Sequence, residues 1–207
     1  MTGYGRGVGW EIDAAAPQAP RVAEVLAAAF AEVPLTRWVL RDPRDLVKVR
    51  SYVAILVATS GPGSLAFCER EGRGAAVWVQ PGRWRNGFMR RARHVPALLG
   101  LTGLARAPGR FFQLSRVARD HPPEPHYYLE LVGVRPDTRG AGLGDALVRA
   151  GLALADAEGV AAHLHTSNRR AIPLYERCGF SVSGELQLGA SGPLVWAMRR
   201  EPAAKSA

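Results

Sequence analysis

Three alternating glycines follow an arginine in the second half of the chain, in the run Arg139-Gly-Ala-Gly-Leu-Gly144. An apolar strand that ends at Val134 is expected before this run, and an amphipathic helix after it. The first N–H groups of a helix have no acceptor within the helix and lie at the positive end of its dipole. Glycines let a phosphate approach those groups closely, and Arg139 adds a charged donor. The run therefore predicts a pyrophosphate-binding loop.

Two other kinds of phosphate loop do not fit this spacing. A nucleotide-hydrolase loop requires Gly-Lys followed by Ser or Thr, which is absent here. A dinucleotide fingerprint places its third glycine three residues after the second, whereas Gly144 follows Gly142 by two. A purely structural glycine turn is the remaining alternative.

A second run follows after one further expected strand: Asn168-Arg-Arg-Ala-Ile-Pro-Leu-Tyr-Glu-Arg-Cys-Gly-Phe180. Together the two runs resemble the acetyl-CoA-binding signatures of the GNAT N-acetyltransferase superfamily, in which Asn-x-x-Ala-x-x-Leu-Tyr-Glu leads to Gly-Phe. The likeness is strong over residues 127–198 and weaker upstream. His126-Tyr-Tyr-Leu and Gly192-Pro-Leu-Val-Trp-Ala-Met are also similar to puromycin-type N-acetyltransferases of actinobacterial origin.

The resemblance implies an α/β (α+β) fold class, the GNAT fold. Its central mixed, mostly antiparallel twisted sheet has six to seven strands, is splayed between strands 4 and 5, and is flanked by helices. One acetyltransferase domain is expected over residues 1–207, with an acetyl-CoA-binding core at 127–198. The basic section 81–120 is expected to be a helical insertion or lid near the acceptor site.

The function that the resemblance implies is transfer of an acetyl group from acetyl-CoA to a primary amine of a small molecule, antibiotic-like or metabolic. The amine attacks the thioester directly in a ternary complex, so no protein nucleophile is required. The alternatives are acetylation of a protein lysine or N-terminus and a non-catalytic CoA-binding module.

The resemblance also assigns roles to individual residues. Tyr175 matches the general acid that protonates the leaving thiolate, with a half-buried core tyrosine as the alternative. A backbone amide near Val132 or Gly133 would stabilise the oxyanion, and Gly133 suits a bulge that frees this amide. The residues expected to bind the cofactor are Val132, Gly133, Val134, Arg139, Gly140, Ala141, Gly142, Leu143, Gly144, Asn168 and Tyr175.

Two residues compete for the role of base that deprotonates the incoming ammonium. Glu130 lies two residues before Val132 and therefore points to the same face of the strand, unless a bulge intervenes. Between two leucines in a cleft its pKa would be raised; a salt-bridged structural glutamate is the alternative. His165 stands where related sequences carry Glu in Leu-Glu-Thr-Ser, and histidine is a competent base near neutrality. A satisfied strand histidine is the alternative there.

Residues of the acceptor pocket are harder to predict. Phe30, Trp38, Trp84 and Tyr127 are candidate aromatic lining residues, together with His165. The section 81–120 predicts two helices broken near Pro108-Gly109. Its apolar residues and arginines are equally consistent with a solvated basic hairpin and with a wall of the acceptor pocket.

Bulk composition limits the remaining classes of protein. The 207 residues carry a net charge of +9 and are 47% hydrophobic, which excludes a disordered chain. No run of about 18 apolar residues predicts a membrane span, and the N-terminus lacks the apolar core of a signal peptide, so a cytoplasmic location is expected. Arginine-rich composition without a nucleic-acid motif argues against nucleic acid. No metal-ligand spacing occurs, so no metal is expected.

Cys68 and Cys178 are the only cysteines and are expected to be reduced and packed. A monomer or a homodimer is expected. Periodicity and turn residues predict strands over 8–13, 65–70, 75–80, 126–134, 161–166, 180–188 and 194–199. They predict helices over 21–32, 42–59 (capped by Asp42), 142–158 and 168–178, and a short turn or helix over 35–40.

Overall fold

The computed structural model describes residues 9–17, 19–61, 63–83 and 93–204. Trp84, the arginines at positions 85, 90 and 91, and the expected strand start at Val8 lie outside the described residues.

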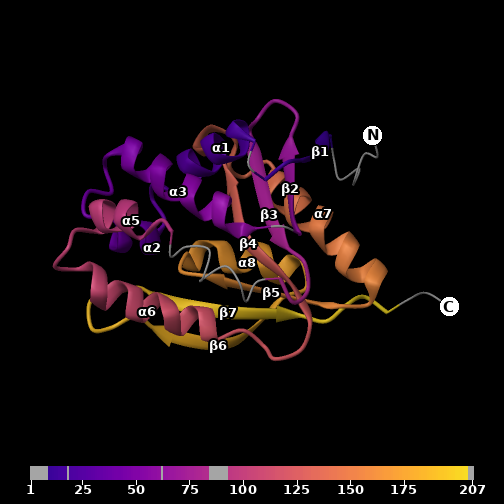
Figure 1. Ribbon diagram of the computed structural model, residues 1–207. Coiled ribbons are helices and arrows are strands. Elements are labelled where there is room, and N and C mark those ends of the chain that lie inside the picture. Colours follow the sequence, from indigo (N-terminus) through magenta and orange to yellow (C-terminus); the bar gives the residue numbers. More distant parts are fainter. Residues whose placement is uncertain (1–8, 18, 62, 84–92, 205–207) are drawn as a thin grey trace.

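The described strands form one seven-stranded sheet in the order β1-β2-β3-β4-β5-β7-β6. Every neighbouring pair is antiparallel except β4 with β5. The predicted mixed, mostly antiparallel sheet is therefore confirmed (Figure 1). The strands are β1 (Ile12–Ala15), β2 (Ser64–Glu69), β3 (Gly74–Val79), β4 (His126–Val134), β5 (Ala161–Thr166), β6 (Ser181–Gln187) and β7 (Leu194–Arg200).

The parallel pair β4–β5 joins at one end only. Its ladder runs from His126 opposite Ala161 to Leu129 opposite Leu164 and stops there, although β4 continues to Val134. The predicted splay between the fourth and fifth strands is thus confirmed. The last five residues of β4 keep β3 as a neighbour on one side and have a gap on the other.

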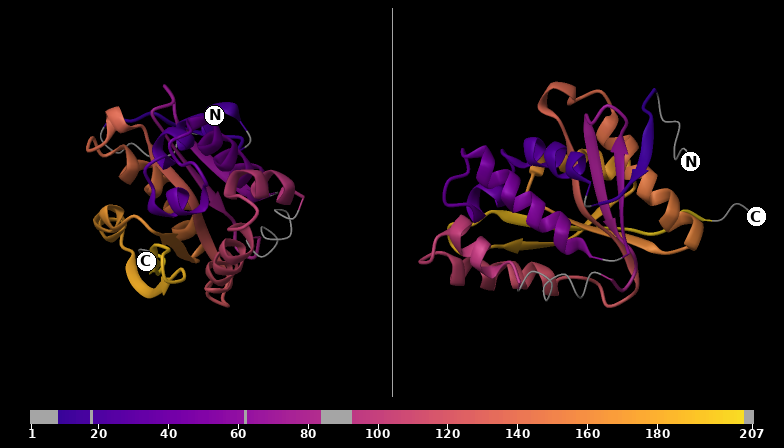
Figure 2. Two further views of the ribbon diagram at one scale, coloured as in Figure 1. Left: turned by 90° about the vertical axis from the view of Figure 1, so that its left-hand side faces the viewer. Right: turned by 45° about the horizontal axis from the view of Figure 1, so that its top comes forward.

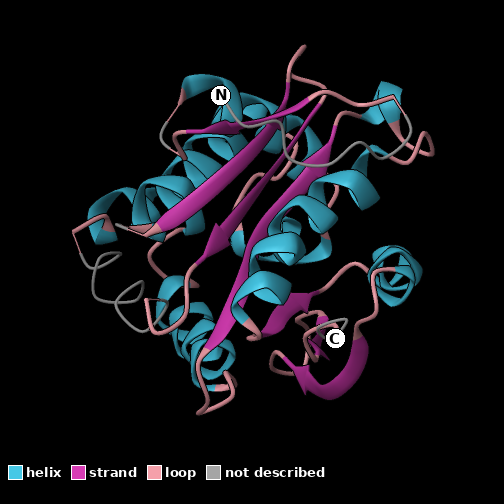
Figure 3. Cartoon of the chain, turned by 90° about the vertical axis from the view of Figure 1, so that its right-hand side faces the viewer, coloured by secondary structure: helices cyan, strands magenta, loops and turns pink. Residues whose placement is uncertain are grey.

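Helices cover both faces of the sheet (Figures 2 and 3). On one face α1 (Pro20–Phe30) and α3 (Leu46–Ser60) pack over a core that includes Val53 and Val77. On the other face α7 (Leu143–Glu158) packs over a core that includes Trp78 and Leu147. Val77 and Trp78 are neighbours in β3, so the two cores follow from the alternation of side chains along a strand.

The remaining described helices are α2 (Pro34–Val39), α5 (Val95–Thr102), α6 (Ala107–Arg119), α8 (Ile172–Arg177) and the 3-10 turns η2 (Pro136–Thr138) and η3 (Arg169–Ala171). In Figure 1, α6 runs along the β6–β7 hairpin, and Arg116 Nη1 donates to the carbonyl of Gln187 at 3.1 Å. The Leu35 N–H donates to Ser167 Oγ at 3.0 Å, which ties α2 to the end of β5.

Two predicted helix boundaries are wrong. The helices of the basic section separate at Gly103, which has a φ of 81°, and Pro108 lies in the first turn of α6. Proline lacks only an N–H that is unsatisfied there anyway, so at this position it starts a helix rather than breaking one. Likewise the cap of α3 is Asp45 and not Asp42, because the Asp45 carboxylate accepts from the N–H groups of Val47 and Lys48.

Both cysteines are free and buried, as predicted. Among the described helices, none combines the length and the apolar character that a membrane span requires.

Candidate active site

One large cavity crosses the sheet where β4 and β5 diverge. Its volume is about 1270 Å³, above the range of about 300–1,000 Å³ typical of a small-molecule pocket. Two parts can be distinguished. One part lies between residues 132–145 and residues 168–177, where the sequence predicts cofactor binding, and is here called the cofactor end. The other part is lined by α2, α3, α5 and α6 and is here called the acceptor chamber, after the predicted position of the acceptor. A single cavity therefore has room for two reactants.

The loop at the cofactor end has the form that the sequence predicts. Gly140 and Gly142 have φ values of 85° and 81°, and Gly142 is the N-cap of α7. Side chains with a Cβ rarely adopt these angles. No side chain caps the helix, so its first N–H groups remain available, and Leu143 and Gly144 line the cavity. The arrangement can bind an anion through backbone donors.

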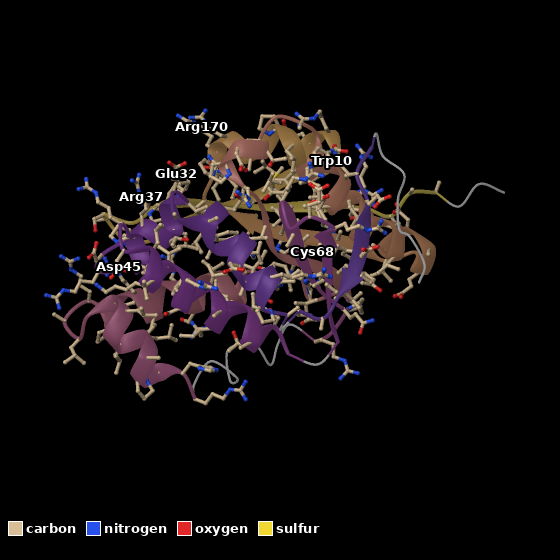
Figure 4. All side chains as sticks on the ribbon, turned by 90° about the horizontal axis from the view of Figure 1, so that it is seen from above. Trp10, Glu32, Arg37, Asp45, Cys68 and Arg170 are labelled. Carbon is tan, nitrogen blue, oxygen red and sulfur yellow. The ribbon has the colours of Figure 1, made fainter. Side chains whose placement is uncertain are left out.

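Charged side chains line part of the cavity. Arg139 Nη1 lies 3.1 Å from Glu32 Oε2, and both side chains are largely exposed. An exposed pair of this kind contributes little free energy, so a bound polyanion can replace Glu32 as the partner of Arg139. Glu32, Arg37 and Arg170 all line the cavity and lie along one edge of the molecule in Figure 4.

Of the residues expected to bind the cofactor, all but Ala141 line the cavity. Ala141 belongs to the same loop, and its carbonyl accepts a hydrogen bond from Trp10 Nε1 at 3.1 Å. Trp10 thus anchors the back of the loop. The sequence gives no motif that predicts this contact across more than a hundred residues.

The bulge in β4 lies at Glu130 and not at Gly133, which corrects the prediction. Val77 is opposite Leu131 and Trp78 is opposite Leu129, so Glu130 is the extra residue. Gly133 pairs regularly with Ala75. The glycine is instead required by α1, because a Cβ at this position would lie 2.5 Å from the Cβ of Ala29.

The bulge also changes which face Glu130 occupies. Leu129 and Val132 contribute to the same core although they are three residues apart, so the alternation of side chains shifts by one between them. The simple expectation that Glu130 and Val132 share a face is therefore wrong. Glu130 still lines the cavity, but the bulge sets its direction.

Glu130 and His165 are the first residues beyond the β4–β5 ladder, one on each strand. Both line the cavity, and so the two candidate bases mark the junction between the cofactor end and the acceptor chamber. The splay of the sheet exposes both residues to the same space.

His165 is held by two partners. Its Nε2 lies 3.2 Å from Asp120 Oδ2, and its Nδ1 lies 3.5 Å from the hydroxyl of Tyr128. The His165 side chain is 5% exposed and that of Asp120 is 45% exposed. The hydrogen bond from His165 is the main cause that lowers the pKa of Asp120. When Asp120 accepts from Nε2–H, Nδ1 becomes the acceptor, as in an oriented histidine base.

The rings of His121 and His163 pack against His165, and the ring of His126 packs against both of them. His163 is 1% exposed, and burial lowers its pKa to about 3. Burial also lowers the pKa of His126. The rings of His163 and His126 are therefore neutral at pH 7. Within the described residues, no group of three or more potential ligands is placed to hold a metal ion.

Tyr175 lines the cavity from α8 and is 7% exposed. Burial raises the pKa of Tyr175 to about 12, against a lowering effect of its hydrogen bond with Thr166. The phenol therefore keeps its proton throughout the neutral range. It can donate a hydrogen bond to an atom that gains negative charge.

The predicted aromatic residues divide between core and cavity. Phe30 lines the cavity, but Tyr127 is 1% exposed and its hydroxyl donates to Glu158 Oε1 at 2.7 Å. Its neighbour Tyr128 lines the cavity instead, because adjacent strand residues face opposite ways. Trp38 is not among the described lining residues; its ring lies beneath the Arg110 guanidinium at 5.2 Å.

Apolar side chains form most of the acceptor chamber. The described lining residues of α3, α5 and α6 are Tyr52, Ile55, Leu56, Val95, Leu98, Phe111, Leu114 and Val117. The described part of section 81–120 thus lines the cavity with apolar side chains of α5 and α6, and none of its described arginines is among the lining residues. Arg110 Nη1 donates to the carbonyls of Val39 and Thr102.

Comparison with known proteins agrees with this geometry. Residues 98–180 match the model of the Acetyltransferase (GNAT) family. A solved protein of Corynebacterium glutamicum, named as histone acetyltransferase HPA2 and related acetyltransferase, is 28% identical with a TM-score of 0.69. The match covers 96% of this chain and 99% of that one.

Two further solved structures share the fold at lower identity. A Drosophila melanogaster polyamine N-acetyltransferase is 18% identical with a TM-score of 0.60, covering 92% of this chain and 100% of that one. Arylalkylamine N-acetyltransferase 2 of Aedes aegypti is 14% identical with a TM-score of 0.57, covering 93% and 99%. The matched domain and the Corynebacterium protein identify the chain as an acyltransferase enzyme.

Proposed function

Given a GNAT acetyltransferase domain, we propose that this enzyme transfers the acetyl group of acetyl-CoA directly to a primary amine of a small molecule. The observation that carries the proposal is the continuous cavity that joins the anion-binding loop of α7 to the acceptor chamber. Both reactants can meet at the junction without a covalent enzyme intermediate. When bound, acetyl-CoA supplies an acetyl group activated as a thioester.

The cofactor end fits this molecule in charge and in shape. Its pyrophosphate would lie on the N–H groups at the start of α7, between Gly140 and Gly144, with Arg139 as a charged donor. Asn168 and the backbone of residues 132–134 would hold the pantetheine arm. Because β5 pairs with β4 only as far as Leu129, alternate amides of this segment face the gap.

One of these amides, at Val132 or Gly133, is the proposed donor to the carbonyl oxygen as it gains negative charge. The donor belongs to a strand that β3 holds on its other side, so it costs little reorganisation. Tyr175 is the proposed general acid for the departing sulfur. With a pKa of about 12 it arrives protonated and stabilises the thiolate first through a hydrogen bond.

Glu130 and His165 are the proposed residues that handle the proton of the ammonium. Glu130 is the base that binds the ammonium and takes its proton directly or through water. His165, oriented by Asp120, is the alternative proton acceptor, and the Asp120 carboxylate is about half exposed to solvent. The balanced reaction converts one ammonium and one thioester into one amide, one thiol and one released proton.

Acetylation of a protein lysine is the second candidate, favoured by the name of the Corynebacterium protein. The wall that α5 and α6 add to the chamber favours a small acceptor. The likeness to puromycin-type enzymes adds antibiotic amines to the candidates, and the acyltransferase assignment argues against a non-catalytic CoA-binding module.

The test is release of CoA thiol from acetyl-CoA with a panel of primary amines and a lysine peptide, using wild type, Tyr175→Phe and Tyr127→Phe. Tyr127 is the matched control, since its hydroxyl contacts Glu158 on α7. Turnover that is lost with Tyr175→Phe and kept with Tyr127→Phe is the expected result. Acetyl-CoA binding without turnover on any amine or on the peptide would overturn the proposal.

A further inference from the structure

We propose that Trp10 is a positioning residue for acetyl-CoA, with Arg73 and Glu69 as its support. The indole N–H of Trp10 sets the direction of the Gly142 N–H, one of the groups that would bind the pyrophosphate. This inference rests on the proposed function, because it concerns how the same site binds its cofactor. Trp10 is not among the described lining residues of the cavity, so it would act through the loop and not by touching the cofactor.

The loop between β4 and α7 has little support of its own, since residues 139–142 are exposed. Among the described residues, two hydrogen bonds hold the loop backbone from outside the loop and its helix. Trp10 Nε1 donates to the carbonyl of Ala141 at 3.1 Å. The N–H of Arg135 donates to the carbonyl of Arg73 at 2.8 Å. The contact with Trp10 is therefore the one that fixes the backbone inside the glycine run.

The peptide bond between Ala141 and Gly142 carries both groups at issue. In a trans peptide the C=O and the N–H point in opposite directions. Because the Ala141 carbonyl points to Trp10, the Gly142 N–H points away from Trp10, and Gly142 lines the cavity whereas Ala141 does not. Gly140 and Gly142 both have positive φ, and glycine adopts either sign of φ readily. Without the indole this peptide can rotate and turn its N–H away from the cavity.

Arg73 and Glu69 hold the indole in place. The Arg73 guanidinium lies over the Trp10 ring, 4.7 Å from its centroid, at the distance of a cation–π contact. Its Nη2 and Nε donate to the two carboxylate oxygens of Glu69 at 2.9 and 3.2 Å. Glu69 is 1% exposed. A bidentate pair with a buried carboxylate holds a guanidinium in one orientation, and this orientation keeps the ring below it in place.

The experiment compares two tryptophans that make the same kind of contact. Trp10→Phe keeps a ring under Arg73 and removes the Nε1 donor. Trp196→Phe is the matched control, because Trp196 Nε1 donates to Glu185 Oε1 at 3.0 Å and Trp196 does not line the cavity. Calorimetry with CoA should give a dissociation constant about fivefold higher in Trp10→Phe, the change expected for one hydrogen bond. Trp196→Phe should bind CoA as wild type does, and both variants should keep the KM for the amine.

S-acetylpantetheine separates a positioning role from a general loss of structure. This fragment of acetyl-CoA lacks the pyrophosphate and the nucleotide. If Trp10 acts through the Gly142 N–H, Trp10→Phe should lower kcat/KM for acetyl-CoA about fivefold and leave kcat/KM for S-acetylpantetheine unchanged. A loosened site would lower both values.

Arg73→Lys tests the support of the indole. Arg70→Lys is its matched control, because Arg70 lies on the same hairpin and pairs with Glu11 at the surface. Arg73→Lys should raise the dissociation constant of CoA about twofold, whereas Arg70→Lys should leave it unchanged. In the Trp10→Phe background, Arg73→Lys should add nothing, because Arg73 acts through the indole N–H. Equal affinity in Arg73→Lys and wild type would remove Arg73 and Glu69 from the proposal.

The outcomes separate this inference from the proposed function. Equal affinity for CoA in wild type and Trp10→Phe, or an equal fall of kcat/KM with S-acetylpantetheine, would overturn the role of Trp10 and leave acetyl transfer standing. A wild-type protein that neither binds CoA by calorimetry nor releases thiol from acetyl-CoA would overturn both.

Discussion

The two ends of the cavity are built in different ways. At the cofactor end, a short continuous stretch of chain supplies a strand, a glycine loop and a helix terminus, and its donors are mainly backbone groups. The acceptor chamber is lined by separate side chains from four helices, and most of these side chains are apolar. Because the cofactor end uses backbone donors, its ability to bind an anion depends little on side-chain identity. The ligand preference of the acceptor chamber depends on each side chain that lines it. Substitutions should therefore affect the two reactants separately.

Tyr175→Phe should have the largest effect. Loss of the proton donor is expected to lower kcat roughly 100-fold, with little change in the dissociation constant of acetyl-CoA. Tyr127→Phe should keep kcat and lose stability by about 1 kcal/mol, the typical contribution of one hydrogen bond. Steady-state kinetics and urea unfolding of both variants check this. Equal kcat in the two variants would show that chemistry does not depend on the phenol.

Glu130→Gln should impair the reaction of the amine without changing the binding of acetyl-CoA. We expect kcat/KM for the amine to fall about 10- to 100-fold, because the ammonium loses its counter-charge and its base. Acetyl-CoA affinity should stay as in wild type. The pH–rate profile decides between the two bases: a profile that keeps its acidic limb in Glu130→Gln and loses it in His165→Gln assigns the proton to His165.

Asp120→Asn refines that comparison. If Asp120 orients His165 through the 3.2 Å contact, the variant should shift the acidic limb of the profile while the KM for acetyl-CoA is unchanged. A shift confined to thermal stability, with the profile of wild type, would limit Asp120 to a structural role.

Stability at the junction should depend on pH through His163. Burial lowers the pKa of this ring to about 3, whereas the unfolded chain protonates histidine near 6.5, so the unfolded state binds the extra proton below that pH. Stability is therefore present above pH 6.5 and decreases as the pH falls. Between pH 7 and pH 5 the loss is about 2 kcal/mol.

Urea unfolding at both pH values checks this, with His163→Leu as the comparison. The variant should keep more of its stability at pH 5, and the slope that remains belongs partly to His126, whose pKa burial also lowers. If the free energy of unfolding of the variant changes with pH as much as that of the wild type, His163 does not cause the pH dependence.

Arg139→Ala should have the smallest effect. Unlike Glu130→Gln, it should weaken the binding of acetyl-CoA and leave the amine unaffected. Loss of an exposed charged donor is expected to weaken acetyl-CoA binding about fivefold, more at low salt, with the KM for the amine unchanged. Arg135→Ala is the matched control, since this arginine precedes the same loop and pairs with Asp137. Equal losses in the two variants would indicate general electrostatic attraction and no specific contact at Arg139.

The sequence predicted the cofactor end because its determinants are local. A strand that ends at Val134, glycines at 140 and 142, and a helix from Leu143 follow from periodicity and backbone angles within one short stretch. The order and direction of the strands, including the splay, followed from the family resemblance. The prediction of these features stays correct even when a predicted boundary is wrong by a residue or two.

Tertiary structure decided what depends on one residue of register or on contacts between distant segments. The alternation along β4 sends Tyr127 to the core and Tyr128 to the cavity, and the bulge at Glu130 comes from pairing with β3. Asp120 reaches His165 from the end of α6, 45 residues away in sequence. The sequence alone thus determined the backbone conformation of the glycine loop and of the helix start that follows it. The fold determined which side chains line the chamber, because packing between elements sets their directions.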